Sequence, residues 1–396
     1  ISKILRSQPP KKGMVLFITC MPLSFPSNAS MYFMSILLNR FNKSFLWYSL
    51  KPGKILYNPW GIRYQTSGHF ILRKLNKTLR YLLYLFFMPI RKGIMAAWFG
   101  YKNNAQIIYA DLAFDSILSS RVCAKLLNVP LISSVHDDPV ERLQRKKYPS
   151  WIIKLFEKSF HKTLIASEKC VVISDYMGNY YNSQYGIKTE TLFLGNKKNE
   201  LFPIKNKNLN NGLIVGSIGS INCVKNWSLF IDACHIINKE HSKNFIKILH
   251  MGHKPKNINS DSIVHYTGWL DEKEFNDKLQ KIDLGFITWS FKKERKITRM
   301  TSLPLKTHSY MKAGVPIFCI SPSDSGINNL LTYYKIGINC SSQNIYEIKS
   351  DIDKSIRGIK KQSYKTGIKK FRRENDLSSF YEKFKKIFSD SNFTIK

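Results

Sequence analysis

The sequence is poor in acidic residues and lacks the cysteine patterns that hold zinc or a disulfide framework. Asp and Glu number 27 against 62 Lys and Arg, so the chain of 396 residues has a formal net charge of +35. Its seven cysteines are odd in number, widely scattered and without a Cys-x-x-Cys pair. This pattern argues against a disulfide-rich secreted protein and against a zinc knuckle, and it favours reduced thiols in a cytosolic compartment.

Other features that define protein classes are also missing. No apolar run reaches the ~20 residues of a membrane span, and the first residues given show no secretory signal. There is no phosphate-binding P-loop, nucleophile elbow or dinucleotide fingerprint. His250 and His253 lack a third ligand at matching spacing, and Asp351-Ile-Asp353 lies beyond the last expected strand on a Lys-rich helix. We therefore expect no metal site.

The excess of positive charge has two interpretations. A field of this sign attracts phosphate groups, nucleic acid or an anionic membrane surface. The chain is also rich in Lys, Ile and Asn, so a compositional bias of its source explains the excess equally well. Aromatic residues interleaved with Lys are no more frequent than the composition predicts, and we therefore expect no specific nucleic-acid partner.

Short apolar runs alternate with helical stretches along most of the chain. With 43% hydrophobic residues the chain has ample material for a core, and at ~100–200 residues per domain it should form two or three domains. The alternation is typical of parallel strands covered by helices on both faces, so the predicted fold class is α/β. In the first half the expected strands are 14–19, 44–49, 107–110, 131–135, 169–173 and 190–194, and the expected helices include 30–42, 116–127 and 149–167.

A polar stretch from 195 to 212, rich in Asn and Lys, interrupts this pattern and predicts a linker. A second series of strands is expected at 213–217, 245–251, 263–267, 284–287, 316–320 and 337–340. We predict a first domain over 1–197, a second over 198–365, and a C-terminal helix over 366–396 that packs back on the first. Two doubly wound sheets imply a cleft between domains, and ligands bind at the carboxyl ends of the strands of such sheets.

The stretch 72–90 predicts a strongly amphipathic helix. At about 100° per residue, apolar side chains such as Leu79, Leu82 and Phe86 fall on one face, while basic ones such as Arg80 fall on the other. One interpretation is a surface helix that packs on its own sheet. The other is a helix that lies in the headgroup plane of an anionic bilayer.

Two segments of the second half are suited to binding phosphate. After the expected strand 213–217, small residues around Gly219 form a turn before a helix that carries Lys225. Backbone amides and a helix N-terminus at such a turn can face an anion, although glycine there is more often a packing device. Farther on, Lys306 lies in the first turn of a helix expected from Pro304 to Gly314. The helix dipole does not stabilise a positive charge at a helix N-terminus. A bound diphosphate would stabilise the charge of Lys306 at that place.

Motifs in both halves resemble those of glycosyltransferases with the GT-B fold. In the second half they are the turn with Lys225, the Gly268-Trp269 loop, and Pro304-Leu-Lys followed by Tyr310-Met-Lys-Ala-Gly-Val-Pro316. In the first half they are Tyr109-Ala-Asp111, the segment 124–130 and Ser134-Val-His136-Asp137. The chain is most similar to the large retaining group called family 4 and to related bacterial enzymes of polysaccharide assembly. The resemblance spans nearly the whole chain and implies two doubly wound Rossmann-like domains that face each other across a cleft.

The resemblance also implies roles for residues at matching positions. Lys225 and Lys306 would offset the charge of the donor diphosphate, and Gly219 would let the backbone approach it. Gly268, Trp269 and Leu270 would lie by the nucleotide base. The full set of implied donor-binding residues is Gly219, Ser220, Lys225, Gly268, Trp269, Leu270, Lys306, Ser309 and Tyr310. Donor binding in this fold needs no metal, because lysines and a helix N-terminus take over its role.

Three positions depart from the family pattern. The family usually has Arg directly after the glycine of the first turn, where this chain has Ser220. It usually also has two glutamates with seven residues between them, and this chain has Thr301 and Ser309 there. A basic loop has two interpretations: it replaces the missing arginine, or it is only a solvated loop. Its residues are Lys292, Lys293, Arg295, Lys296 and Arg299.

The first half offers side chains that could act on an acceptor. His136, Asp137 and Asp138 follow an expected strand, where a carboxylate or an imidazole could serve as base on a hydroxyl or bind a sugar, so they are the candidate catalytic residues. The equal alternative is a helix N-cap, a role that suits Asp137 or Asp138 ahead of Pro139. Asp111, at the end of another expected strand, is a second carboxylate candidate.

The resemblance and the charge together predict a metal-independent hexosyltransferase. It would move a sugar from a nucleotide-sugar donor, with UDP as the favoured nucleotide, to a growing surface glycan of the polysaccharide, capsule or lipopolysaccharide type. We expect a glycan or lipid-linked acceptor, no cofactor, and a cytoplasmic location with peripheral binding to the anionic inner face of the plasma membrane. The alternative is a catalytically inactive GT-B-like binding or scaffolding protein, which the missing glutamates favour.

Overall fold

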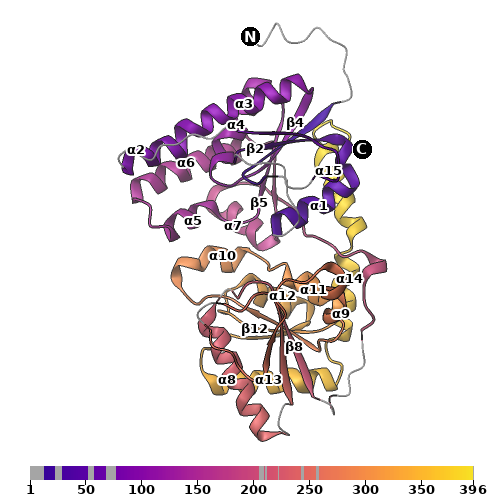
Figure 1. The fold of residues 1–396 in the computed structure, drawn as a ribbon. Coiled ribbons are helices and arrows are strands. Elements are labelled where there is room, and N and C mark those ends of the chain that lie inside the picture. The colour runs from indigo at the N-terminus through magenta and orange to yellow at the C-terminus, as the bar shows by residue number, and fades with distance from the viewer. Residues whose placement is uncertain are drawn as a thin grey trace. The chain divides into compact units, whose positions relative to one another are not determined.

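The chain divides into two compact units. Unit 1 comprises Ile1–Phe193 with Tyr381–Lys396, and unit 2 comprises Leu194–Phe380. The computed structural model, drawn in Figure 1, describes residues 13–22, 29–51, 58–67, 77–204, 209, 212–221, 223–241, 245–255 and 258–395. Part of the expected linker, at 205–208 and 210–211, lies outside these residues.

Unit 1 is built on a parallel sheet of seven strands in the order β3-β2-β1-β4-β5-β6-β7. The strands are β1 (Met14–Thr19), β2 (Phe45–Ser49), β3 (Arg63–Thr66), β4 (Ala105–Asp111), β5 (Leu131–Val135), β6 (Lys169–Val172) and β7 (Glu190–Thr191). Six of them coincide with the apolar runs of the sequence. The edge strand β3 has the sequence RYQT and no buried residue, so no apolar run marks it.

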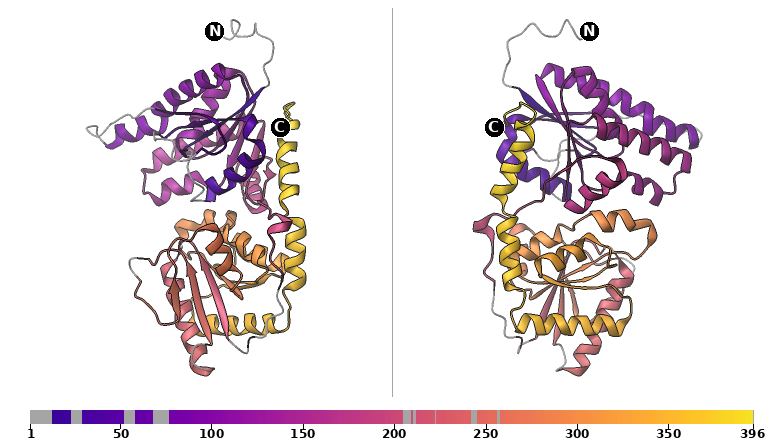
Figure 2. Two further views of the ribbon diagram at one scale, coloured as in Figure 1. Left: turned by 45° about the vertical axis from the view of Figure 1, so that its right-hand side comes forward. Right: turned by 180° about the vertical axis from the view of Figure 1, so that it is seen from behind.

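Helices cover both faces of this sheet (Figure 2). Leu16 and Ile18 of β1 pack on the side of α3 and α4, while Phe17 between them stacks on Tyr109, which contacts Phe384 of α15 on the other side. The helical segments of this unit are α1 (Ala29–Phe41), η1 (Asn42–Ser44), α2 (Lys77–Leu82), the π-helical η2 (Leu83–Phe87), α3 (Met88–Lys102), α4 (Asp115–Leu127), α5 (Pro139–Arg145), α6 (Ser150–Ala166), α7 (Asp175–Tyr185) and most of α15 (Leu377–Ser389).

Unit 2 is built on a parallel sheet of six strands in the order β10-β9-β8-β11-β12-β13. These strands are β8 (Leu213–Ile218), β9 (Ile246–Met251), β10 (Val264–Tyr266), β11 (Leu284–Thr288), β12 (Ile317–Ile320) and β13 (Gly337–Cys340). The chain builds outward from β8 to β10 and then returns to the other side of β8 with β11. The strand order therefore reverses between β8 and β11, which is where ligands bind in sheets of this kind.

The helices of unit 2 form two layers. α8 packs with α13, while α14 packs with α11 and α12. The segments are η3 (Lys198–Glu200), α8 (Val224–Glu240), α9 (Glu272–Leu279), η5 (Lys293–Arg295), α10 (Lys296–Thr301), α11 (Lys306–Ala313), α12 (Gly326–Tyr334), α13 (Ile345–Lys360) and α14 (Lys365–Glu374). Because α14 packs on α11 and α12, residues 366–380 belong to unit 2, whereas the sequence assigned all of 366–396 to a helix on the first domain.

The predicted fold class is confirmed: the chain is α/β, with two parallel Rossmann-like sheets. The predicted helix 72–90 is described from Lys77 onward and continues through α2, η2 and α3 to Lys102, with 72–76 outside the described residues. Its phase differs from a uniform α-helix, because the π-helical turn at Leu83–Phe87 rotates the residues on its C-terminal side about the helix axis. Phe86 consequently packs against the core while Phe87 is exposed. Among the described residues no helix is long and apolar enough to cross a membrane.

Candidate functional site

A glycine follows each of the neighbouring strands β8 and β9 at its carboxyl end. Gly219 follows β8 with a φ of +65°, a conformation that glycine adopts without strain, and its amide donates to the carbonyl of Met251 over 2.8 Å. A Cβ on Gly219 would meet no atom within 4 Å, so this side of the turn is open. A Cβ on Gly252, which follows β9, would lie 2.9 Å from the Gly219 carbonyl oxygen. The two glycines thus leave bare backbone at the point where strand order reverses.

Lys306 meets this turn from the N-terminus of α11. Its ammonium Nζ donates a hydrogen bond of 2.5 Å to the carbonyl of Ser220. Burial lowers the pKa of Lys306 from its ordinary value of 10.5 to about 8, because the charged form loses water. The structure therefore brings together Gly219, Ser220 and Lys306, three of the donor-binding residues implied by the resemblance.

His250 belongs to the same group, a place that the sequence did not predict. It is fully buried at the end of β9, with Nδ1 3.0 Å from the Ser217 hydroxyl. Its Nε2 has no hydrogen-bond partner in the described part of the chain. Burial and the neighbouring positive charge of Lys306 lower the pKa of His250 to about 4, so the imidazole is neutral. The sequence did contain a signal for this place, because His250 is a polar residue at the end of an expected apolar strand. Within the described residues no three His, Cys, Asp or Glu side chains group to hold a metal ion.

Lys225 makes a different contact. It lies in the first turn of α8, and its Nζ donates to Oε1 of Gln343, in the loop after β13, over 3.2 Å. The amide of Gln343 donates in turn to Asn226 over 2.6 Å, and Asn226 donates to the carbonyl of Trp289 over 2.8 Å. This chain of bonds links the first turn of α8 to the loops after β11 and β13 and holds Lys225 by Gln343, whereas Lys306 is held at Ser220.

The loop after β10 presents an aromatic surface. Gly268 has a φ of +71°, and the next residue, Trp269, is 67% exposed. Its ring lies edge-on to His253 with 5.8 Å between ring centroids, while Leu270 is half-buried. An exposed indole at the carboxyl edge of a sheet is a large flat surface on which a base can stack.

Tyr310 has a structural role, which corrects its expected place among the donor-binding residues. It is fully buried, and its hydroxyl contacts the carbonyls of Gly216 and Phe286 at 2.9 and 3.0 Å. A Cβ on Gly285 would come within 2.5 Å of the tyrosine ring, so the ring lies directly on the backbone of β11. The side chain ties α11 to the sheet and is not open to a ligand.

The two positions at which the resembling family has glutamate are occupied by hydroxyl residues with different surroundings. Thr301 is buried, and its hydroxyl donates to the carbonyl of Ile297 one turn earlier in α10, over 2.8 Å. Ser309 is half-buried on α11. Neither residue supplies a carboxylate to the site.

Arg299 anchors the basic segment after β11. Its guanidinium makes two bonds to the carboxylate of Asp324, of 2.8 and 2.9 Å, and a third to the carbonyl of Lys292 of 3.1 Å. These bonds lower the pKa of Asp324 below its ordinary value. Arg299 is therefore engaged within the fold. The exposed side chains of Lys292, Lys293 and Lys296 remain available to an anion.

In unit 1, Asp138 is the N-cap of α5, which is one of the two roles that the sequence predicted for it. Its Oδ1 accepts from the amide of Glu141 over 2.7 Å, and its Oδ2 accepts from the hydroxyl of Tyr181 over 3.1 Å. Burial raises the pKa of Asp138 to about 6. This buried carboxylate, with a hydrogen bond to each oxygen, holds the start of the helix.

His136 and Asp111 lie near each other at the carboxyl edge of the sheet in unit 1. Burial raises the pKa of Asp111, and the His136 imidazole opposes that rise. Asp111 accepts from the Thr19 hydroxyl over 3.3 Å, and Nε2 of His136 lies 3.3 Å from the Ser134 hydroxyl. Asp137, next to His136, is exposed. The strand order reverses between β1 and β4, which end at Thr19 and Asp111, so these groups occupy the equivalent ligand position of this sheet.

No protein-family model and no curated protein matches the sequence. Solved structures match it in shape over nearly its whole length. Sucrose-phosphate synthase from Thermosynechococcus elongatus has a TM-score of 0.67 at 11% identity, and the match covers 95% of this chain and 98% of that chain. The chain has the GT-B fold.

Two further structures of similar shape are of proteins named for different activities. The UDP-forming α,α-trehalose-phosphate synthase from Burkholderia xenovorans, in complex with glucose-6-phosphate, has a TM-score of 0.62 at 8% identity, covering 94% of this chain and 99% of that chain. A protein assigned as UDP-N-acetylglucosamine 2-epimerase from Listeria monocytogenes has a TM-score of 0.59 at 11% identity, covering 96% and 97%. At these identities the GT-B fold is shared and the chemistry has to be argued from the residues.

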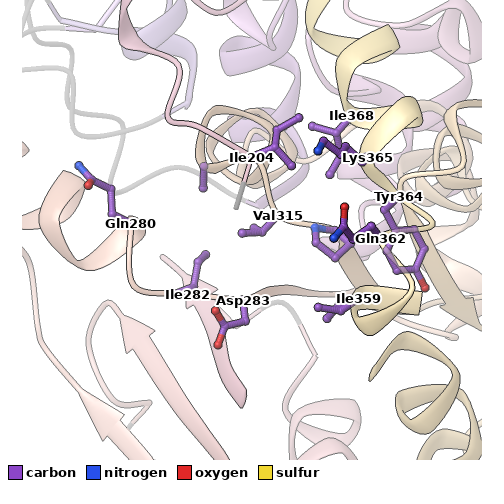
Figure 3. A pocket seen from close by; sticks show the side chains of 13 residues that line it. Ile204, Gln280, Ile282, Asp283, Val315, Ile359, Gln362, Tyr364, Lys365 and Ile368 are labelled. Atoms are coloured by element: carbon purple, nitrogen blue, oxygen red, sulfur yellow. The ribbon is translucent and has the colours of Figure 1, made fainter. Parts of the chain in front are cut away.

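A pocket in unit 2 lies at the opposite edge of the GT-B sheet. Figure 3 shows Ile282 and Asp283, which precede β11, facing Ile359, Tyr364 and Ile368 from α13 and the start of α14. The pocket is a shallow hollow that is partly open to solvent. Because its strand residues precede β11 and β12, it adjoins the amino ends of those strands and is distinct from the Gly219–Lys306 group.

Proposed function

We propose that this protein is a glycosyltransferase that binds a nucleotide-sugar donor in unit 2 and transfers the sugar to a glycan acceptor. The hydrogen bond that joins Lys306 to Ser220 is the observation that carries the proposal. It places an ammonium group, a helix N-terminus and a glycine turn together at the point where strand order reverses. That combination suits the diphosphate of a nucleotide sugar.

The charge of Lys306 suits both binding and catalysis. With a pKa of about 8, the ammonium group is mostly protonated at neutral pH. Burial removes the water that stabilises its charge, and the negative charge of a bound diphosphate would stabilise it instead. Negative charge on the diphosphate increases as the bond to the sugar breaks, so a fixed cation stabilises the transition state more than the ground state. Lys225 and the exposed lysines 292, 293 and 296 are second contributors.

We further propose that the donor is UDP-linked and that the acceptor is a growing, lipid-linked surface glycan at the cytosolic face of the plasma membrane. Structures of similar shape include proteins named as UDP-forming, and the net charge of +35 favours an anionic membrane. His136 and Asp111 are the candidate groups for accepting the proton of an acceptor hydroxyl, since both lie at the carboxyl edge of unit 1.

A second candidate function is a GT-B binding protein without catalysis. Thr301 and Ser309 favour it, because a hydroxyl stands at each position where the resembling family has a carboxylate. Only the first function requires turnover, whereas a binding or scaffolding protein does not. Release of free nucleotide from a bound nucleotide sugar in the presence of acceptor separates them.

The proposal is tested by a thermal-shift screen against UDP-, GDP-, dTDP- and CMP-linked sugars. A ligand at about 100 times its dissociation constant should stabilise the native protein by ~2.7 kcal/mol. The same ligand should stabilise Lys306→Ala much less, while Lys273→Ala, an exposed lysine of α9, should respond like the native protein. If no nucleotide sugar raises the unfolding temperature, the protein binds no such donor and the proposal fails.

A further inference from the structure

The inward face of α3 is fixed against α4 by close contacts. Nζ of Lys92 forms an ion pair of 2.5 Å with Asp115, and the hydroxyl of Ser119 donates to the carbonyl of Pro89 over 2.8 Å. A Cβ on Gly93 would come within 2.7 Å of the Ser119 carbonyl oxygen. Ala96, Ala97 and Gly100 continue this buried face. The helix therefore packs through small residues and cannot rotate about its axis without breaking these contacts.

The outward face of the same helix carries large apolar side chains. Phe87 is 61% exposed, Ile94 52% and Trp98 58%. We call this surface the α3 face, and its exposed residues are Phe87, Ile90, Arg91, Ile94, Trp98, Tyr101 and Lys102. Five of these seven are apolar or aromatic, so the usual distribution of a surface helix is inverted: small residues face the core and large ones face solvent.

The charged residues exposed on the α3 face have one sign. No Asp or Glu occurs before Asp111, while this part of the chain contains sixteen Lys and Arg. The two charged residues of the α3 face are Arg91 and Lys102, and Nζ of Lys102 lies 4.7 Å from the centroid of the Trp98 ring. An aromatic surface with basic residues among it suits an apolar layer covered by anionic groups.

We propose that the α3 face docks the protein on an anionic lipid bilayer. The helix would lie in the interface plane, with Ile94 and Trp98 among the acyl chains and Arg91 and Lys102 at the phosphates. A second copy of this chain is the other candidate occupant, but it would bring the same unbalanced positive charge to the contact. The inference rests on the membrane location in the proposed function and specifies which surface binds the membrane. That surface lies mainly on α3, whereas the sequence pattern pointed to 72–90. Its test needs no sugar transfer.

The apolar contribution is tested by co-sedimentation of the full chain with vesicles of phosphatidylcholine, with and without phosphatidylglycerol. The double variant Ile94→Gln/Trp98→Gln keeps the charge and, because both side chains are exposed, should keep the native unfolding temperature. It should bind the mixed vesicles at least about tenfold more weakly than the native protein. The matched control is Tyr333→Gln/Tyr346→Gln, which removes two exposed aromatic side chains from unit 2 and should bind like the native protein.

The electrostatic contribution is tested by Arg91→Gln/Lys102→Gln against the control Lys273→Gln/Lys281→Gln. Each charge near an anionic surface contributes about fivefold in affinity, so the first pair should weaken binding about 25-fold. The control removes the same charge from exposed positions of unit 2 and should retain binding. Vesicles of phosphatidylcholine alone should bind the native protein far less than the mixed vesicles.

Three results would overturn the proposal. If the native protein does not bind the mixed vesicles, or if the Ile94→Gln/Trp98→Gln variant binds them as well as the native protein, the α3 face does not dock on a membrane. A native dimer in light scattering that the same variant converts to a monomer would assign the face to a second copy of the chain. Nucleotide binding by the variant, measured in parallel, shows whether the donor site is intact whichever result is found.

Discussion

Lys306 is held where its positive charge reduces stability. Its folded pKa of about 8 lies below the unfolded value, so the native state disfavours the protonated form at neutral pH. After allowance for partial exposure, the cost is of order 1–2 kcal/mol. One hydrogen bond to the Ser220 carbonyl offsets part of it. An anionic ligand explains a lysine at such a costly position better than packing does.

The role of Asp138 can be tested through stability. Because its folded pKa of about 6 is above the unfolded value, the native state binds more protons between about pH 4 and 6, and stability falls as pH rises through that window. Asp138→Asn keeps an N-cap acceptor without the charge, so it should be up to ~2 kcal/mol more stable than the native protein at pH 7 and equal to it at pH 4. Urea unfolding at the two pH values measures both differences.

Asp138→Ala is the companion variant. It removes both acceptors, so the amide of Glu141 and the hydroxyl of Tyr181 lose their bonds. It should be about 2–3 kcal/mol less stable than Asp138→Asn. An Asn variant as unstable as the Ala variant, or one that loses glycosyl transfer while remaining folded, would return Asp138 to the list of catalytic candidates.

The sequence predicted the positions of those residues whose placement depends on their neighbours in the chain. Gly219 and Lys306 lie at a strand-to-helix turn and a helix start, and both features are visible in neighbouring residues. Asp138 before Pro139 likewise predicts an N-cap, one of the two roles it was given. Tyr310 and His250 could not be placed, because their surroundings come from strands far away in the chain: Gly285 beneath the tyrosine ring, and Ser217 beside the imidazole.

At the scale of elements, α11 carries Lys306 at one end and is held by Arg372 at the other. The guanidinium of Arg372, on α14, donates to the carbonyls of Met311, Lys312 and Phe202 over 2.7, 2.9 and 2.9 Å. Burial lowers the pKa of Arg372 to about 10. Two of these bonds reach carbonyls in the last turn of α11, and the third ties the segment around Phe202 to the same helix end.

Loss of this cap should destabilise unit 2. Arg372→Ala should lower the free energy of unfolding by about 2–3 kcal/mol, because three bonds from a charged donor are lost. The neighbouring Arg373 is exposed, and Arg373→Ala should change stability by less than about 0.5 kcal/mol. Urea unfolding of both variants gives the comparison. Equal losses would mean that Arg372 contributes only surface charge. Nucleotide affinity should also fall in Arg372→Ala, since α11 positions Lys306.

Strands were easier to predict than helix faces. Buried parallel strands are continuous apolar runs, so twelve of the thirteen strands in the described residues were visible, and the polar edge strand β3 was missed. The helix 72–90 illustrates the opposite case. Its apolar residues predict an amphipathic helix, but the π-helical turn at Leu83–Phe87 changes which of them face solvent, and no residue in that segment marks the change.

At the scale of the whole molecule, the sequence alone predicted the two Rossmann-like sheets, because alternation of apolar runs and helices survives even when sequence identity to known structures is near 10%. The chemistry is harder to predict, since this fold occurs in proteins that are named for different activities. The positive charge of the chain is also uneven, with no acidic residue before Asp111. That asymmetry becomes informative only when combined with the exposed side chains of α3.

The central claim, that a donor diphosphate binds at Lys306, is tested most directly by calorimetric titration of the intact protein with UDP from pH 7 to 10. The ammonium group is charged below its free pKa of about 8, so affinity should be highest at pH 7 and should fall by up to about tenfold per pH unit above 8. Lys306→Ala should bind ~10–100-fold more weakly at pH 7 and show no such decline. Equal affinity of the two proteins at pH 7, with the same pH profile, would contradict the account.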